Sequence, residues 1–229
     1  MTAGTLLVDT GASVATSTSI VNGGLLKVNG AAGAVSVNAG GSLGGSGTVG
    51  ALSLNNGGLL NPGNSPGKLT ASSAIVLGGA TYNWQISALQ GVAGADWDLL
   101  SVTGLLDMSG VTSATKWNLV VTGDSGFAGW TDSSSYSYAF AEAASVSGFN
   151  PTAGTDITSL FNITTSGITS LPNASYNANG DFKVVVGNAN GLTTLNLVAV
   201  AVPEPSTGSL MMFGLGGLLL NRLLRRKVS

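Results

Sequence analysis

The sequence predicts an all-β protein: a parallel β-helix, or solenoid, followed by a single short C-terminal transmembrane helix. Three observations support this prediction. Apolar residues alternate in short runs that Gly, Asn and Ser interrupt, which is typical of strands and turns. A short unit recurs near the N-terminus, as in solenoids. An apolar stretch with a basic end closes the chain.

The first third of the chain repeats alternating apolar residues, then Asn, Gly-Gly and Leu. Gly24, Gly41 and Gly58 recur at intervals of 17 residues. One row of alternating side chains would face a core, while Asn and Gly would supply the positive φ that a corner requires. We therefore expect stacked parallel coils in residues 1–110. An antiparallel sandwich is the alternative, because periodicity does not fix strand direction.

Beyond residue 110 the repeat fades, but strand-like runs continue. The expected strands cover residues 117–121, 136–140, 156–164, 182–186 and 192–200. We interpret residues 111–201 as a β-rich extension or cap of the solenoid, in which bulky Trp and Phe side chains fill the end. A separate small β domain is the alternative.

The composition excludes several classes of function. The 229 residues include no His and no Cys, which excludes disulfides, Ser-His-Asp and Cys-His catalysis, and zinc sites built from imidazole or thiolate. Charged residues make up 8% of the chain, and residues 1–202 contain four lysines against nine acids. Such a body has no basic surface for phosphates, so we expect no nucleic-acid binding. Scarce charge suits stacked coils, where like charges would repeat about 4.8 Å apart.

The C-terminal tail begins with a segment that suits a processing enzyme. Pro203 and Pro205 hold Glu204 extended and withhold backbone donors, so the β body should end there. We predict that this segment, residues 202–207, contains a sorting and processing motif. The motif residues are Val202, Pro203, Glu204, Pro205 and Ser206.

A membrane helix is expected next, over residues 208–224, with a basic tail at 225–229. The residues predicted to orient it are Arg222, Arg225, Arg226 and Lys227. By the positive-inside rule they keep this end in the cytoplasm, which places the β body outside. An amphipathic or buried C-terminal helix is the alternative.

The order of Pro203-Glu204-Pro205-Ser206, an apolar helix and an Arg-rich end resembles the PEP-CTERM sorting signal. The resemblance implies recognition by an exosortase, a membrane-embedded transpeptidase-like enzyme, in a Gram-negative-type bacterium. The precursor would contact inner-membrane lipid transiently. The body would then reach the cell envelope, the surface or the extracellular matrix, with exopolysaccharide as a partner.

A second resemblance covers about residues 20–110. Residues 44–50, 60–69 and 96–104 are similar to the autotransporter-associated β-strand repeat, also called the passenger-associated transport repeat. That family implies a β-helical, secreted passenger. Residues 1–5 lack the basic and apolar parts of a signal peptide, so we expect upstream sequence that holds the signal peptide and further coils.

These features predict a non-catalytic exported protein of the cell surface or exopolysaccharide matrix. A surface adhesin or glycan-binding protein is the first alternative. The second is an aspartate-dependent envelope hydrolase, because residues 6–13 match the aspartic-protease signature and Asp124 could pair with Asp9. We expect Asp9 instead to be a turn residue, in the position that Asn29 and Asn55 occupy in neighbouring repeats.

Asp96 and Asp98 flank Trp97 and would share one face of a strand. A structural role is expected for them, with Ca²⁺ as the cation that such oxygen ligands would suit in an extracellular compartment. Beyond that calcium alternative we predict no cofactor, no metal site and no catalytic residue.

Overall fold

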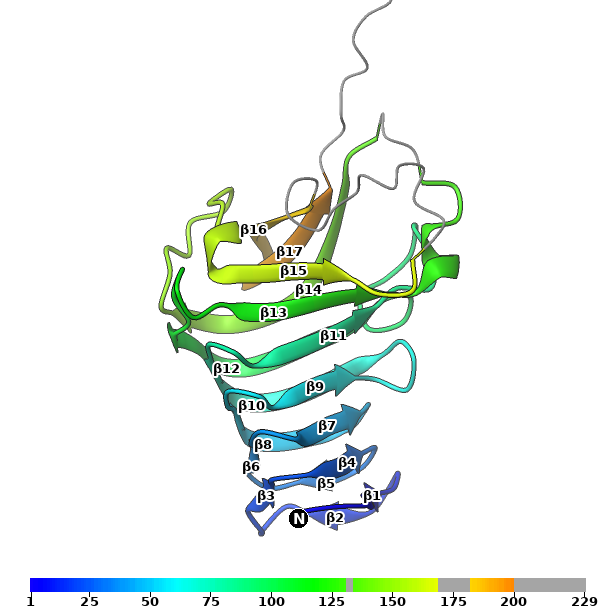
Figure 1. Cartoon of the computed structure of the whole chain (residues 1–229), viewed down its shortest axis with the longest axis vertical. Coiled ribbons are helices and arrows are strands. Elements are labelled where there is room, and N and C mark those ends of the chain that lie inside the picture. The colour runs from blue at the N-terminus through cyan, green and yellow to red at the C-terminus, as the bar shows by residue number, and fades with distance from the viewer. Residues whose placement is uncertain (131–133, 169–181, 200–229) are drawn as a thin grey trace, which may run out of the picture.

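The computed structural model describes residues 1–130, 134–168 and 182–199. From β1 to β15 the chain alternates between two β-sheets, returning to each sheet one position further along. Figure 1 shows the resulting stack of coils, which widens from the N-terminus toward β13 and β15. The all-β prediction is confirmed, and both sheets consist mostly of parallel strands.

Sheet A consists of seven strands that are all parallel to their neighbours. In spatial order they are β1 (Thr5–Val8), β4 (Gly24–Val28), β7 (Gly41–Gly45), β9 (Leu59–Pro62), β11 (Thr81–Gln85), β13 (Trp117–Thr122) and β15 (Phe161–Thr165). Their order in space is their order in the chain, so each coil covers the previous one.

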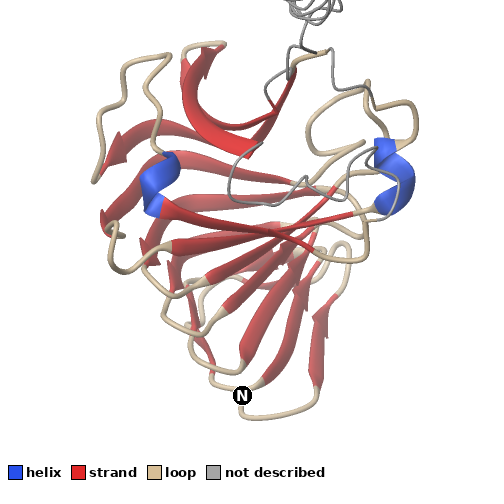
Figure 2. Ribbon diagram, turned by 45° about the horizontal axis from the view of Figure 1, so that its top comes forward, coloured by secondary structure: helices blue, strands red, loops and turns tan. Residues whose placement is uncertain are grey.

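Sheet B has ten strands and faces sheet A. Its parallel part is β2 (Ser13–Val14), β3 (Ser19–Val21), β5 (Ala31–Ala32), β6 (Val35–Val37), β8 (Thr48–Leu54), β10 (Lys68–Leu77), β12 (Leu99–Gly110) and β14 (Tyr136–Ser147). Two antiparallel strands, β17 (Leu192–Ala199) and β16 (Phe182–Ala189), complete it beside β14. The short 3₁₀ helices η1 (Asp124–Phe127) and η2 (Thr158–Leu160) lie at the wide end (Figure 2).

A ladder of inward-facing side chains runs through sheet A. The strand register aligns Leu26, Leu43, Leu60, Tyr82, Leu119 and Ile163. Each of these side chains is at most 2% exposed. This confirms the prediction that one row of alternating residues faces a core, where burial of each large apolar side chain contributes about 1.5–3 kcal/mol.

The two glycines of a repeat serve different purposes. Gly40 has a φ of 79°, which an L-residue rarely adopts, and it turns the corner. Gly41 allows close stacking, because a Cβ there would overlap the carbonyl oxygen of Val21 in the coil below. Among the described residues, Ser65 and Asn190 are the non-glycine residues with positive φ. The prediction that repeat asparagines supply positive φ is therefore wrong.

The repeat asparagines instead form a hydrogen-bonded ladder. Asn38 Nδ2 donates to Asn22 Oδ1 over 2.6 Å, and Asn55 Nδ2 donates to Asn38 Oδ1 over 2.7 Å. This ladder follows strands of sheet B, whereas Asp9 and Asn29 follow the paired sheet A strands β1 and β4. Asp9 shares a position with Asn29, but the prediction that Asn55 occupies the same position is wrong.

Aromatic side chains fill the wide end between the sheets. The rings of Tyr82, Trp117, Phe140 and Phe161 pack with centroids 5.6–6.2 Å apart. Tyr82 Oη also donates a hydrogen bond of 2.9 Å to the Phe140 carbonyl, which links β11 to β14. Large rings can occupy this end because the sheet B strands β12 and β14 are longer than those near the N-terminus, and the stack of coils is wider there (Figure 1).

The sheets continue across the predicted boundary at residues 110 and 111. β13 pairs with β11, and β14 pairs with β12, in parallel register. The antiparallel alternative does not describe the strands from β1 to β15. Strand direction changes where β17 joins β14, after which the structure describes the chain as far as Ala199.

Candidate functional site

The predicted sorting segment lies outside the described residues, but the strand that leads toward it is described. β17 lies between β14 and β16 and is antiparallel to both. Leu195, Leu197 and Ala199 of this strand are buried. Val202 follows Ala199 by three positions in the sequence. The chain therefore leaves the described body from a strand that is hydrogen-bonded on both sides.

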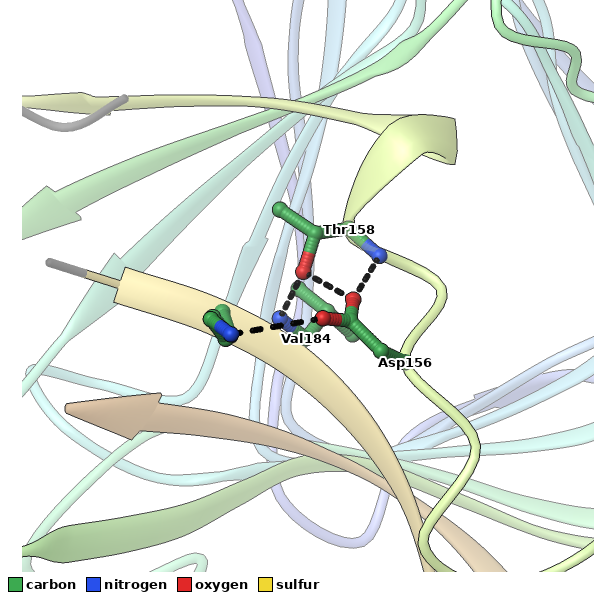
Figure 3. A network of polar contacts seen from close by, with 4 residues as sticks. Asp156, Thr158 and Val184 are labelled. Atoms are coloured by element: carbon green, nitrogen blue, oxygen red, sulfur yellow. Dashed lines mark hydrogen bonds and ion pairs between the residues drawn. The ribbon is translucent and has the colours of Figure 1, made fainter. Parts of the chain in front are cut away.

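A polar network ties β16 to the segment before η2 (Figure 3). Asp156 Oδ1 accepts hydrogen bonds from the backbone N–H of Thr158, 2.9 Å away, and from its hydroxyl, 2.6 Å away. The Thr158 hydroxyl oxygen accepts a third bond, 2.9 Å long, from the N–H of Val184 in β16. The Lys183 ammonium lies 3.7 Å from Asp156 Oδ2. The Thr158 bonds are the main reason that the pKa of Asp156 lies below its usual value.

The predicted membrane helix and its basic residues also lie outside the described residues. These are residues 208–224 together with Arg222, Arg225, Arg226 and Lys227. Within residues 1–130, 134–168 and 182–199, no helix combines the length and apolar character needed to cross a membrane.

A groove lined by both polar and apolar residues lies on the outward face of sheet A. Its volume is about 450 Å³. The lining comes from β4, β7, β9, β11 and β13 and from the loop after β9. It includes the apolar residues Leu25 and Pro62 beside Lys27, Ser42, Gly44, Asn61, Gly63, Asn64, Ser65, Asn83, Gln85, Asp98 and Thr122. Most of these groups are amides or hydroxyls.

Asp98 holds the loop that forms one wall of this groove. Its Oδ1 accepts a hydrogen bond of 2.8 Å from the N–H of Gly67, and its Oδ2 accepts one of 3.0 Å from the N–H of Gln85. The residue is 3% exposed. Burial raises the pKa of Asp98 to about 7, because desolvation of the carboxylate outweighs the two backbone donors that favour its charged form.

Asp96 does not share a strand face with Asp98. It lies in a turn, where its Oδ2 accepts a hydrogen bond of 2.8 Å from the N–H of Val92. Asp98 points into the body, and β12 begins only at Leu99. The prediction of two carboxylates on one face is wrong. No group of three or more acidic side chains suited to a metal ion occurs in the described parts of the chain.

The residues of the hydrolase alternative lie in different settings. Asp9 follows β1, and its Oδ1 accepts a hydrogen bond of 2.8 Å from the N–H of its neighbour Thr10. This geometry fits the turn role that we expect for Asp9. Asp124 begins η1, which follows β13 at the wide end of the molecule.

Sequence reasoning missed both the groove and the network around Asp156. The groove depends on which residues of five strands align on the outward face. One signal was present, because the Pro62–Gly67 loop and Asp98 both fall in segments with repeat-like character. Their contact spans 31 residues and could not be read from either segment alone.

The tail can now be compared with known proteins. Residues 201–227 match the PEP-CTERM protein-sorting motif. The PEP-CTERM motif implies an exported protein that an exosortase recognises and sorts at the membrane toward the cell surface. Comparison of the chain with curated proteins returns no match. The matched motif thus starts two positions after the last described residue of β17.

Proposed function

We propose that this chain is a non-catalytic structural protein of the cell surface or of an exopolysaccharide matrix, and that an exosortase cleaves it at Pro203–Ser206. The observation that carries the proposal is the PEP-CTERM motif at residues 201–227, directly after the closing strand of a β-rich body. In this proposal the tail is the substrate of an enzyme, and the body is its cargo.

The chemistry of the tail suits each step. The Pro203-Glu204-Pro205 sequence favours an extended conformation at Glu204, which a protease-like active site can accept. The apolar residues 208–224 hold the precursor in the inner membrane of a Gram-negative-type cell until cleavage. The four basic residues that follow retain their end in the cytoplasm, so the motif faces the exosortase on the outer side.

The body suits a structural role outside the cell. Its stacked sheets satisfy backbone hydrogen bonds from coil to coil, and its aromatic end is packed between both sheets. Such continuous pairing leaves few locally unfolded segments for proteases. The resemblance of residues 20–110 to the autotransporter-associated repeat supports the same role, since that family forms secreted passengers. A metal or cofactor is not needed for it.

The cleavage proposal is tested by replacing all four residues of Pro203–Ser206 with Ala in the native host. The unaltered protein should lose its tail, so that intact-mass measurement finds no C-terminus at Ser229. The variant should keep Ser229 and remain in the membrane fraction. As a control, Asn150, Pro151 and Thr152 form an exposed Pro-containing loop of the body, and their replacement with Ala should leave processing unchanged. A native protein that still ends at Ser229 would overturn the proposal.

A surface glycan-binding protein is the second candidate function. The groove on sheet A favours it, because amide and hydroxyl side chains gather there in a concave surface. This candidate is compatible with the sorting proposal, since cargo released outside the cell can act as a binder.

A further inference from the structure

We infer that the outward face of sheet A binds an extended, uncharged oligosaccharide, with its main subsite in the groove around Gly44. The inference names a ligand class for the proposed surface protein and therefore rests on that proposal. It is carried by the strand register, the side-chain chemistry of the groove and the distribution of charge around it.

The strand register creates the groove by placing a glycine between larger residues on neighbouring strands. Parallel pairing aligns Lys27 of β4 with Gly44 of β7, and Gly44 with Asn61 of β9. Asn83 of β11 continues the row, because its Nδ2 donates to Asn61 Oδ1 over 2.9 Å. Gly44 has no side chain, so the row has a gap between the side chains of Lys27 and Asn61. The loop that carries Ser65 forms a wall of this gap.

The groove presents pre-oriented hydrogen-bonding groups. Asn61 Nδ2 donates to Ser42 Oγ over 2.8 Å, which fixes the amide plane of Asn61 between Ser42 and Asn83. Ser65 Oγ donates to Gln85 Oε1 over 2.7 Å and orients that amide too. Each amide NH₂ has a second hydrogen, and each amide oxygen has a second lone pair. These remaining positions can bind hydroxyl groups, which both donate and accept.

The charge of the groove favours an uncharged ligand. Asp98 is its one acidic lining residue, and both of its carboxylate oxygens accept backbone N–H groups. Lys27 is its one cation. A polyanion would need more positive charge than one ammonium and would be repelled by a chain in which acids outnumber bases. A cation would meet no exposed carboxylate. Polyhydroxylated sugars are the ligands that match this surface.

The polar face extends beyond the groove, which indicates a polymer. Asn162 Nδ2 of β15 donates to Asn118 Oδ1 of β13 over 3.0 Å. These two residues line a second hollow of about 390 Å³, together with Asn56 and Lys116. Asn118 pairs with Thr81 rather than with Asn83, so this second pair of amides lies on the same face but two residues further back along the strands. An oligosaccharide that crosses the strands diagonally would meet first the Asn61 and Asn83 pair and then the Asn118 and Asn162 pair.

The test compares two matched pairs of asparagines in the full-length chain. Asn61→Ala with Asn83→Ala removes the amides of the groove. Asn38→Ala with Asn55→Ala removes a comparable hydrogen-bonded pair from the ladder that follows the sheet B strands β6 and β8, so the structural cost of both variants should be similar. The probes are hexasaccharides of glucose, galactose, mannose and N-acetylglucosamine in several linkages, with uronate hexamers as the charged arm. Binding is measured by titration calorimetry.

At least one uncharged hexasaccharide should bind. The groove variant should lower its affinity about tenfold or more, equivalent to about 1.4 kcal/mol. The Asn38 and Asn55 variant should leave this affinity unchanged. Binding of uronates alone, no binding of any uncharged hexasaccharide, or equal losses in both variants would each overturn the inference. Tail processing does not involve the groove. Failure of cleavage at Pro203–Ser206 with intact sugar binding would therefore contradict the sorting proposal alone.

Discussion

At the level of single residues, Asp98 shows how the fold places a carboxyl group where its charge is unfavourable. The residue joins the loop after β9 to β11 through the N–H groups of Gly67 and Gln85. Its own N–H and carbonyl group bond the Gln85 carbonyl and the Trp84 indole. Asp98 is therefore a structural residue at the wall of the groove, which agrees with the expected structural role.

The raised pKa of Asp98 predicts a pH-dependent stability. Its pKa is about 7 in the folded protein and about 3.8 in the unfolded chain, so the folded state binds the proton more tightly. The stabilisation from this proton is complete below pH 3.8 and is lost as the pH rises through 7. Urea unfolding of the unaltered protein should show this loss between pH 4 and 7, and Asp98→Asn should remove it.

Asp107 provides a control of opposite sign for that experiment. Hydrogen bonds from Ser147 and Ser109 lower its pKa, so its contribution to stability is present near neutral pH and is lost as the pH falls below its ordinary value. Asp107→Asn should leave the change between pH 4 and 7 intact. If Asp98→Asn kept the same pH dependence as the unaltered protein, the prediction that Asp98 has a raised pKa in the folded state would be contradicted.

At the level of elements, β16, the strand that pairs with the last described strand β17, depends on a short segment around the start of η2. The N–H of Ile157 donates to the Val184 carbonyl over 2.9 Å, and the N–H of Val186 donates to the Thr155 carbonyl over 2.9 Å. Together with the Thr158 hydroxyl, these bonds cover the outer edge of β16. The segment thereby protects an edge that would otherwise offer free backbone groups for aggregation.

Thr158→Val tests this anchoring. The substitution keeps the shape of the side chain but removes the acceptor of the Val184 N–H, which should cost about 1–3 kcal/mol locally. Amide hydrogen exchange at Val184 should accelerate about tenfold or more. Thr164→Val, on the exposed face of β15, is the matched control and should leave that rate unchanged. Equal rates in both variants would show that the hydroxyl does not hold β16.

At the level of the whole molecule, charge is divided between body and tail. Four of the eight basic residues lie in the last eight positions, whereas nine of the ten acids lie in residues 1–202. Neutral stacked coils avoid like charges at the spacing of neighbouring strands. The concentrated basic end suits an orientation signal, because the positive-inside rule depends on Lys and Arg close to the end of a membrane helix.

Replacing Arg222, Arg225, Arg226 and Lys227 with Ser should therefore impair export. A fraction of the chain should keep its body in the cytoplasm, where protease added to intact spheroplasts cannot reach it. Lys27, Lys68, Lys116 and Lys183 offer an equal number of basic residues in the body, and their replacement should leave the accessible fraction unchanged. Full accessibility of the tail variant would contradict the predicted orientation.

The sequence by itself determined the features that depend on local pattern. Alternation of apolar residues predicts strands, spaced Gly-Gly pairs predict stacked coils, and the order of Pro203-Glu204-Pro205-Ser206, apolar run and basic end predicts the PEP-CTERM motif found at residues 201–227. Each signal lies within about one coil or one helix. For this reason composition and spacing were enough to predict an all-β cargo with a sorting tail.

Only the tertiary structure decided which residues meet across coils. The groove requires Lys27, Gly44 and Asn61 to align on three strands. The burial of Asp98 requires the Gly67 loop to lie against it. These relations depend on register, and a one-residue shift would reverse the face on which every side chain lies. The local sequence pattern constrains that register only weakly. The all-β body was therefore predictable from the sequence, whereas the surface that we propose to bind sugar was not.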